Sequence, residues 1–275
     1  PCVAGYIGGD TVASVHATGM AGKDGVRLLL DIGTNGEIVL GGRDGLISCS
    51  VACGPAFEGA EISCGMRSVP GAISRVSFAQ GEFWYVVIGG GYPKGICGTG
   101  IVDALAEMLR SGVVDGTGRL LEPDELPEGL HGTVSGNKKG NLSFTVAPGV
   151  KIRAADIRKL QLAKAAVRAG VELLMKSVGV SAADIDEVCL AGGFGTQLNI
   201  ASAAAIGLIP PELAGKTRAI GNAALDGVHR ALCEADGFAQ LLDIRSRCRY
   251  MELSGSAEFA DAFVNAMAFY DDEED

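Results

Sequence analysis

The sequence Leu28-Leu-Leu-Asp-Ile-Gly-Thr-Asn-Gly-Glu-Ile-Val-Leu40 decides the fold of this chain. An apolar run, a turn over residues 33–36 and a second run with mixed apolar and polar positions predict a β-hairpin whose first strand is buried. Asp31 sits in that apolar first strand. An ionised carboxylate in apolar surroundings is unfavourable unless a cation, a ring of donors or a proton compensates it. Asp31 is therefore the first candidate functional residue.

The turn after Asp31 is predicted to expose main-chain N–H groups to a ligand. Glycine adopts backbone angles closed to other residues and has no Cβ to keep a ligand away. A carboxylate beside open N–H groups is what a magnesium-bound polyphosphate requires. The alternative is that Asp31 merely closes the turn through its own backbone, as aspartate often does. The candidate ligand-binding residues of this turn are Gly33, Thr34, Asn35 and Gly36.

The composition predicts a tightly turned α/β protein and argues against two classes of partner. At 275 residues, the chain is long enough for one large domain or two moderate ones. A hydrophobic content of 48% with 41 glycines argues against disorder. The net charge of −10, without a visible basic stripe, argues against nucleic acid or an anionic membrane surface as partner. Local dipoles and a metal must therefore hold any phosphate ligand.

The eight cysteines are scattered without a C-x-x-C pair, which predicts reduced thiols and a cytoplasmic location. Cys49 and Cys53 could place two thiolates at one metal, or both could be small buried hydrophobes. No apolar run approaches the roughly 20 residues of a membrane span, and no signal peptide opens the chain. Because the chain begins at Pro1, we expect it to be a piece of something longer. The run 271–275 is expected to be a solvated acidic tail.

Two further glycine turns precede predicted helices, where free N–H groups can bind an anion. The first follows a predicted strand over residues 2–7, and Asp10 or Thr11 is its expected N-cap. An ordinary capped helix start is the alternative there. The second turn opens a helix that ends near Gly112. Its candidate ligand-binding residues are Gly98, Thr99 and Gly100.

Another turn follows a predicted strand over residues 187–190, and a small-residue helix opens further on. The candidate ligand-binding residues in these two places are Gly192, Gly193, Phe194, Gly195 and Asn222.

Apolar residues spaced three and four positions apart predict a long helix over 156–178. Ser181 and Asp184 have the spacing of a capping box. Strands over 45–51, 72–78 and 83–88 are predicted to share one sheet. The segment 115–150 is expected to be an irregular excursion.

The glycine turns, taken in order, resemble the nucleotide-binding turns of the actin, sugar-kinase and Hsp70 superfamily. Two further motifs make the chain similar to the C-terminal ATPase region of reductive activators of corrinoid proteins, which are related to dehydratase activators. The likeness covers nearly the whole chain. The segments that carry it are Gly-Gly-Asp-Thr at 8–11, Asp-Ile-Gly-Thr-Asn at 31–35, Cys-Gly-Thr-Gly at 97–100, Ala-Gly-Gly-Phe-Gly at 191–195, Gly-Asn-Ala-Ala-Leu at 221–225, Gly-Pro-Ala-Phe-Glu-Gly at 54–59 and Gln-Leu-Ala-Lys-Ala-Ala at 161–166.

The resemblance implies a two-lobed, actin-like (ribonuclease-H-like) α/β fold with mixed sheets flanked by helices. The first lobe is expected over residues 1–95, and the second over 96–275. The implied cofactors are ATP and Mg²⁺, with Asp31 orienting the magnesium, in part through water. Asp31 and Asp10 are the expected catalytic residues. The turns at Thr11, Thr34–Asn35 and Thr99 are expected to hold phosphates, and Gly192–Gly195 to flank the adenosine.

The family's members return the cobalt of an inactivated corrinoid from Co(II) to Co(I), are usually dimeric, and carry an N-terminal [2Fe-2S] domain. This chain lacks the plant-type cysteine spacing for such a cluster, so the electron carrier is expected upstream of Pro1. The expected partners are a corrinoid protein and a second copy of the chain, with no nucleic acid and no membrane. Cys97 lies closer to its Gly-Thr-Gly turn than the cluster-binding cysteine of the dehydratase activators does, so no cluster is assigned to it.

Two other functions stay open at this point. A small-molecule kinase of the same fold would need a base beside an acceptor hydroxyl, and Asp10 or Glu58 could serve. A non-catalytic nucleotide sensor would bind ATP without releasing phosphate. The sequence leaves open which corrinoid protein is the partner, and which acid positions the attacking water.

Overall fold

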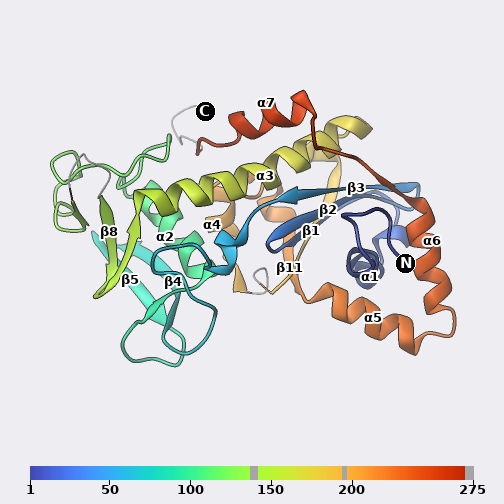
Figure 1. Cartoon of the computed structure of the whole chain (residues 1–275), viewed down its shortest axis with the longest axis horizontal. Coiled ribbons are helices and arrows are strands. Elements are labelled where there is room, and N and C mark those ends of the chain that lie inside the picture. Colours follow the sequence, from blue (N-terminus) through green and yellow to red (C-terminus); the bar gives the residue numbers. More distant parts are fainter. Residues whose placement is uncertain (137–141, 194–196, 270–275) are drawn as a thin grey trace. The chain divides into compact units, whose positions relative to one another are not determined.

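The fold is taken from a computed structural model, which describes residues 1–136, 142–193 and 197–269 (Figure 1). The chain forms two compact units. The first unit comprises Pro1–Cys53, Ala166–Gln197 and Pro210–Val264, and the second comprises Gly54–Ala165, Leu198–Ile209 and Asn265–Asp275. This division does not follow the boundary predicted after residue 95, because strands from the second half of the sequence return to pair with the first hairpin.

The first unit is built on a six-stranded sheet with the order β11-β10-β1-β2-β3-β12. The predicted hairpin is confirmed, since β1 and β2 pair in antiparallel fashion. β10 pairs with β1 in parallel, which brings residues far apart in the sequence to one edge of the sheet. The strands of this sheet are β1 (Val26–Ile32), β2 (Asn35–Gly42), β3 (Gly45–Ala52), β10 (Ile185–Ala191), β11 (Thr217–Gly221) and β12 (Cys248–Tyr250).

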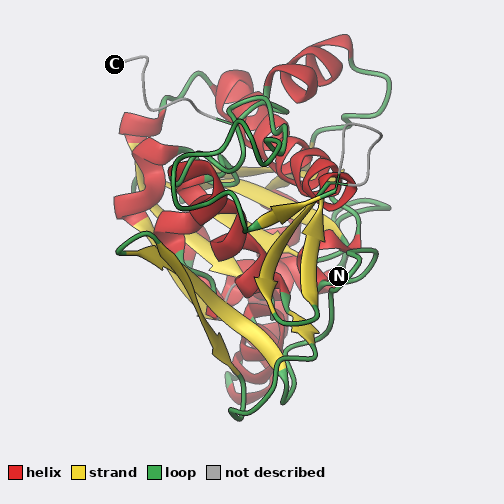
Figure 2. Ribbon diagram, turned by 90° about the vertical axis from the view of Figure 1, so that its left-hand side faces the viewer, coloured by secondary structure: helices red, strands yellow, loops and turns green. Residues whose placement is uncertain are grey.

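Helices flank the sheets, as the predicted α/β class requires (Figure 2). The strand predicted over residues 2–7 does not form, because only an isolated bridge joins Ala4 to Ile7. The helical elements of the first unit, apart from its share of α3, are α1 (Gly9–Thr18), η1 (Met20–Gly22), η3 (Ala182–Asp184), η5 (Pro211–Lys216), α5 (Ala223–Cys233), α6 (Gly237–Arg247) and α7 (Ala257–Asn265).

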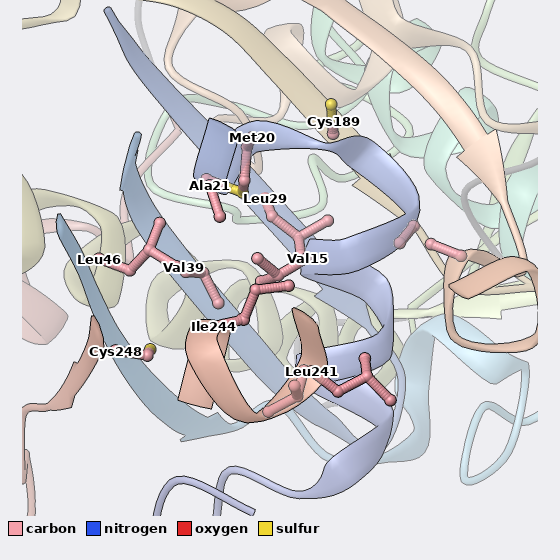
Figure 3. Close-up of a cluster of buried hydrophobic side chains, with 13 residues drawn as sticks. Val15, Met20, Ala21, Leu29, Val39, Leu46, Cys189, Leu241, Ile244 and Cys248 are labelled. Carbon is pink, nitrogen blue, oxygen red and sulfur yellow. The ribbon is translucent and has the colours of Figure 1, made fainter. Parts of the chain in front are cut away.

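A buried cluster fills the space between one face of this sheet and the helices α1 and α6 (Figure 3). Leu29 and Val39 from the strands meet Val15 from α1 and Ile244 from α6 there. Successive side chains of a strand alternate between its two faces, so Asp31 projects from the same face as Leu29. The apolar cluster therefore lies on the same face of the sheet as the Asp31 carboxylate.

Small residues let α1 and α5 approach each other backbone to backbone. Gly227 of α5 is buried, and a Cβ built on it would stand 1.8 Å from the carbonyl oxygen of Ala13 in α1. No side chain fits that space without moving one helix. The close approach fixes α5 against α1.

The second unit contains two three-stranded sheets, with the orders β5-β4-β6 and β7-β8-β9. β4 and β5 therefore do not share a sheet with β3, contrary to the prediction. The segment expected to be irregular contains short strands in its second half. The elements of this unit are η2 (Pro55–Glu58), β4 (Ala72–Ala79), β5 (Glu82–Val87), β6 (Gly95–Ile96), α2 (Gly98–Arg110), β7 (Val134–Ser135), β8 (Ser143–Ala147), β9 (Val150–Arg153) and α4 (Ile200–Ala205).

Two carboxylates of α2 accept hydrogen bonds from main-chain N–H groups of β4. These N–H groups lie beyond the short segment of β4 that pairs with β6. β6 pairs only with Ala72 and Ile73 of β4. Further along, Val76 N–H donates to Asp103 at 3.4 Å, and Phe78 N–H donates to Glu107 at 3.1 Å. Because a buried, unpaired N–H group is destabilising, these acids have a structural role in the second unit.

The long predicted helix is confirmed as α3 (Ala154–Val178), whose first part belongs to the second unit and whose remainder belongs to the first. The predicted capping box is also confirmed, because Asp184 accepts hydrogen bonds from the N–H and the hydroxyl of Ser181. Both patterns are local in sequence, which explains why they were predictable. No helix in the described part of the chain combines the length and the apolar character needed to cross a bilayer.

We expect Gly227→Ala to destabilise the protein by about 1–3 kcal/mol, because the new Cβ forces α5 away from α1. Gly215→Ala is the matched control, since a Cβ at Gly215 would meet open space. Chemical denaturation monitored by circular dichroism measures both variants. Equal stability of the two variants would contradict the close packing described for Gly227.

Candidate functional site

The candidate site lies at the carboxyl edge of the six-stranded sheet. β1, β10 and β11 run parallel, and Asp31, Ala191 and Gly221 stand in register across them. The residues that follow these strands, among them Gly192 and Asn222, therefore emerge at one edge. In open α/β sheets this edge is where ligands bind.

Asp31 is half-buried at this edge and points toward α1. Ser14, a buried residue of α1, donates from its hydroxyl to Asp31 Oδ2 at 3.4 Å. Burial raises the pKa of Asp31, the Ser14 hydrogen bond opposes that rise, and the charge of Asp10 adds to it. The turn itself is closed by the main chain, from Gly33 N–H to the Asn35 carbonyl at 2.9 Å. The turn therefore does not need the Asp31 carboxylate to close it.

Glu37 is a functional candidate that the sequence analysis missed. It lies directly opposite Asp31 on β2, and Ser50 lies opposite Glu37 on β3. Burial raises the pKa of Glu37 to about 7, with further contributions from the charges of Asp31 and Asp10. A carboxylate of this kind gains and loses its proton near neutral pH. The predicted turn over residues 33–36 would have placed Glu37 opposite Ile32, whereas the observed register pairs Ile32 with Gly36 and so brings Glu37 beside Asp31.

Asp10 and Thr11 lie within α1 and do not cap it. The N-cap is Gly8, with no side-chain hydrogen bond, and Asp10 stands in the first turn. Its carboxylate accepts a hydrogen bond from the Thr11 N–H at 2.8 Å. The Asp10 carboxylate therefore occupies the anion position expected at this helix start, and it faces the other two acids. The predicted phosphate contact at Thr11 is not supported by this geometry.

The three acids Asp10, Asp31 and Glu37 form the acid cluster of the site. Among the described residues, hydrogen bonds oppose the raised pKa values of Asp31 and Glu37, and no lysine or arginine charge does so. Like charges in a partly buried place repel one another strongly. The cluster therefore requires protons or a cation from outside the chain.

Gly192 provides the space beside this cluster. Its φ is +93°, and a Cβ built on it would lie 2.9 Å from both Asp31 Oδ1 and the Ile32 carbonyl. Its N–H donates to the Gly221 carbonyl at 2.9 Å. At Gly193 a Cβ would meet open space. A small-residue cradle next to a carboxylate cluster fits a magnesium-bound phosphate, because Mg²⁺ takes few protein carboxylates and keeps water and phosphate ligands.

Other predicted glycines serve packing. Gly36 is buried, and a Cβ there would lie 2.8 Å from Cys53 Sγ. Among the described glycines with positive φ, neither Gly33 nor Gly36 occurs. The prediction that their unusual backbone angles open the turn to a ligand is therefore wrong. Asn222 caps α5, since its side-chain oxygen accepts from the Leu225 N–H at 3.0 Å, so that oxygen has a structural role.

The predicted turn Gly98–Gly100 lies in the second unit and opens α2, which has no side-chain cap. Thr99 is buried, and its hydroxyl donates to the Ser74 carbonyl at 3.0 Å. A Cβ at Gly100 would lie 2.4 Å from the Ile73 carbonyl, so this glycine is required by packing. Only the first-turn N–H groups remain as anion donors here. The predicted residues Phe194 and Gly195 lie outside the described residues.

The cysteines do not form a metal site. Burial raises the pKa of Cys53 to about 12 and raises that of Cys49 as well, so both thiols stay protonated at neutral pH. Within the described ranges, no group of three or more His, Cys, Asp or Glu side chains has the geometry to hold a metal ion. The alternative of small buried hydrophobes therefore holds for Cys49 and Cys53. Magnesium at Asp31 would need water and phosphate to complete its coordination.

We expect the Glu37 carboxyl to titrate with a pKa of about 7 in protein free of nucleotide and magnesium. Since the folded pKa lies above the unfolded value, ionisation of Glu37 reduces stability as pH rises from about 4.5 to about 7. Asp31→Asn should lower the pKa of Glu37 by removing a neighbouring charge. Carbon-13 NMR of the glutamate carboxyl groups measures both values. A Glu37 pKa near 4.5 in the unmodified protein would contradict the buried acid cluster.

Comparisons with known proteins agree with the fold. Residues 25–275 match the family described as the C-terminal domain of RACo, the ASKHA domain. A solved structure titled reductive activator for corrinoid,iron-sulfur protein superposes with a TM-score of 0.88 at 38% identity, covering 98% of this chain and 44% of that one.

Two curated relatives are similar over nearly all of this chain. The corrinoid activation enzyme RamQ of Eubacterium limosum is 34% identical over 280 residues, which cover 98% of this chain and 47% of that protein. The [Co(II) methylated amine-specific corrinoid protein] reductase of Methanosarcina barkeri is 24% identical over 295 residues, covering 98% and 51%. This chain thus spans about half the length of the curated relatives it matches. On the family match, the chain belongs to the family of RACo C-terminal ASKHA domains.

Proposed function

We propose that this chain is the ATP-binding and ATP-hydrolysing part of a reductive activator that returns Co(II) corrinoid proteins to Co(I). The family match and the activities named for its relatives support this assignment. The observation that carries it is the acid cluster beside Gly192, which has no basic partner among the residues that the structure describes. A magnesium–nucleotide complex supplies the cation that such a cluster requires.

In this proposal, Asp31 holds Mg²⁺ through water, and the main chain holds the phosphates. We place the phosphates against the main chain of the turn that follows Asp31, at Asn35, and against the main chain at Gly193. When bound, ATP supplies the phosphoryl group for hydrolysis, and Mg²⁺ offsets the charge of the phosphates. Such a site needs no basic patch, which agrees with the acidic composition of the chain.

Glu37 is the acid that we propose accepts the proton of the attacking water. A general base works best when its pKa lies near the operating pH, and the pKa of Glu37 is raised to about 7. Ser14 and Ser50 orient the two neighbouring carboxylates through hydrogen bonds. The charge of Asp10 adds to the negative potential around Asp31 and Glu37, which favours a magnesium-bound phosphate over a free anion.

The chemistry of cobalt reduction needs parts beyond this chain. We propose that a [2Fe-2S] domain supplies the electron, that a corrinoid protein is the partner, and that the protein acts as a homodimer. If nucleotide binding favours one conformation by about 5 kcal/mol, and that conformation changes the cobalt ligation of the partner, a one-electron potential can shift by roughly 200 mV. Contacts alone can therefore assist a difficult reduction.

We expect Asp31→Asn to lower magnesium-dependent phosphate release by roughly 10²–10³-fold, the range seen when one group that stabilises charge at an active site is lost. Asp44→Asn is the matched control, because Asp44 is an exposed acid outside the cluster. Phosphate release is measured with and without a Co(II) corrinoid protein, together with the return of that protein to Co(I). If Asp31→Asn retains near wild-type hydrolysis and reactivation, the role given to Asp31 is wrong.

The same assay separates the other two functions. A kinase would respond to a sugar or an acid as acceptor and not to the corrinoid protein. A nucleotide sensor would bind ATP tightly and release no phosphate, whether or not the partner is present.

A further inference from the structure

A cavity of about 680 Å³ opens in the first unit beside the carboxyl ends of β3 and β12. The start of α7 forms its other wall. Three aromatic side chains, Tyr6, Tyr250 and Phe259, line it. Tyr6 is 68% exposed, so one of these rings has most of its surface uncovered. The acid cluster and the proposed ATPase reaction make no use of these aromatic residues.

The cavity carries one ionised group, and that group is negative. Glu252 lines it, and neither lysine nor arginine does so among the described residues. The Ser254 N–H donates to Glu252 Oε1 at 3.0 Å, and the Tyr250 hydroxyl donates to Oε2 at 3.4 Å. The hydrogen bond from Ser254 lowers the pKa of Glu252, so its carboxylate is charged at neutral pH. Both carboxylate oxygens are thereby held in place with lone pairs to spare.

We propose that this cavity binds an organic cation, an ammonium or guanidinium group that carries apolar substituents. The faces of aromatic rings attract cations through the negative side of their quadrupole, and apolar substituents gain from contact with the same rings. The carboxylate of Glu252 adds a charge-assisted contact. The site is complete within the first unit.

Other ligand classes fit this lining less well. An anion would meet Glu252 without any basic residue to offset the repulsion. A bare metal ion would find a single carboxylate, and the described residues hold no group of three metal-binding side chains. A purely apolar ligand would leave the carboxylate at the cavity wall without a new partner.

The cavity adjoins the acid cluster without overlapping it. Ser50 and Asn35 line the cavity, and Ser50 is hydrogen-bonded to Glu37. A bound cation would therefore lie near the turn that follows Asp31. The proposal does not depend on the proposed ATPase function, because its test measures binding alone.

The test compares choline with 3,3-dimethylbutan-1-ol, which has the same shape with carbon in place of the charged nitrogen. NMR titration follows the amide signals of Val51, Ala52 and Ala260 at the cavity wall. We expect choline to bind roughly tenfold more tightly than its neutral counterpart. N-acetyl-arginine methylamide forms a second arm, and tighter binding of this probe than of choline would identify a protein side chain, not a free amine, as the source of the cation.

Three variants test the cavity wall. Glu252→Gln and Phe259→Leu should each weaken choline binding several-fold, and Tyr250→Leu should do the same if it folds. Tyr92→Leu is the matched control, since Tyr92 is 90% exposed and lies outside the cavity. Equal binding of choline and its neutral counterpart would overturn the proposal. So would shifts confined to residues outside the cavity, or wild-type affinity in both Glu252→Gln and Phe259→Leu.

Discussion

Repulsion among the acids Asp10, Asp31 and Glu37 is the constraint on which the candidate site depends. β1 and β2 place two of these carboxylates opposite each other, and α1 brings the third. Burial raises the pKa values of Asp31 and Glu37, the charge of Asp10 adds to both, and the charge of Asp31 adds to that of Glu37. Such an arrangement lowers the stability of the empty protein at neutral pH, and a bound cation restores it. Unfavourable electrostatics of this kind are characteristic of functional sites.

Apolar packing holds the acids in place despite their repulsion. The cluster that contains Leu29 and Val15 fixes α1 over the sheet, and Ser14 is carried with it. Gly227 lets α5 lie against α1 at backbone distance. Helices α1 and α5, whose first turns flank the sheet edge, are thus positioned by apolar residues and glycine, which take no part in binding or catalysis. The same edge also borders the aromatic cavity at Tyr250.

Local patterns in the sequence were sufficient for the hairpin, for α3 and for the Ser181 capping box. The positions of the glycines were visible, but their roles were not. A sequence does not show whether a glycine makes room for a ligand or for neighbouring protein atoms. Only the tertiary contacts distinguish Gly192 from Gly36 and Gly100. Sheet membership is likewise long-range, which is why β4 could not be separated from β3. Glu37 was missed because its place opposite Asp31 depends on the exact register of the hairpin, which is one residue away from that of the predicted turn over residues 33–36.

The most direct test of the account is the number of protons released when a magnesium complex of a non-hydrolysable ATP analogue binds at pH 7. Calorimetry in buffers of different ionisation enthalpy measures this number. Because the pKa of Glu37 is about 7 in the empty site, a cation that lowers it should release up to about half a proton, and Glu37→Gln should release almost none. Tight binding without proton release in the wild-type protein would contradict the claim that the acid cluster is what the magnesium complex compensates.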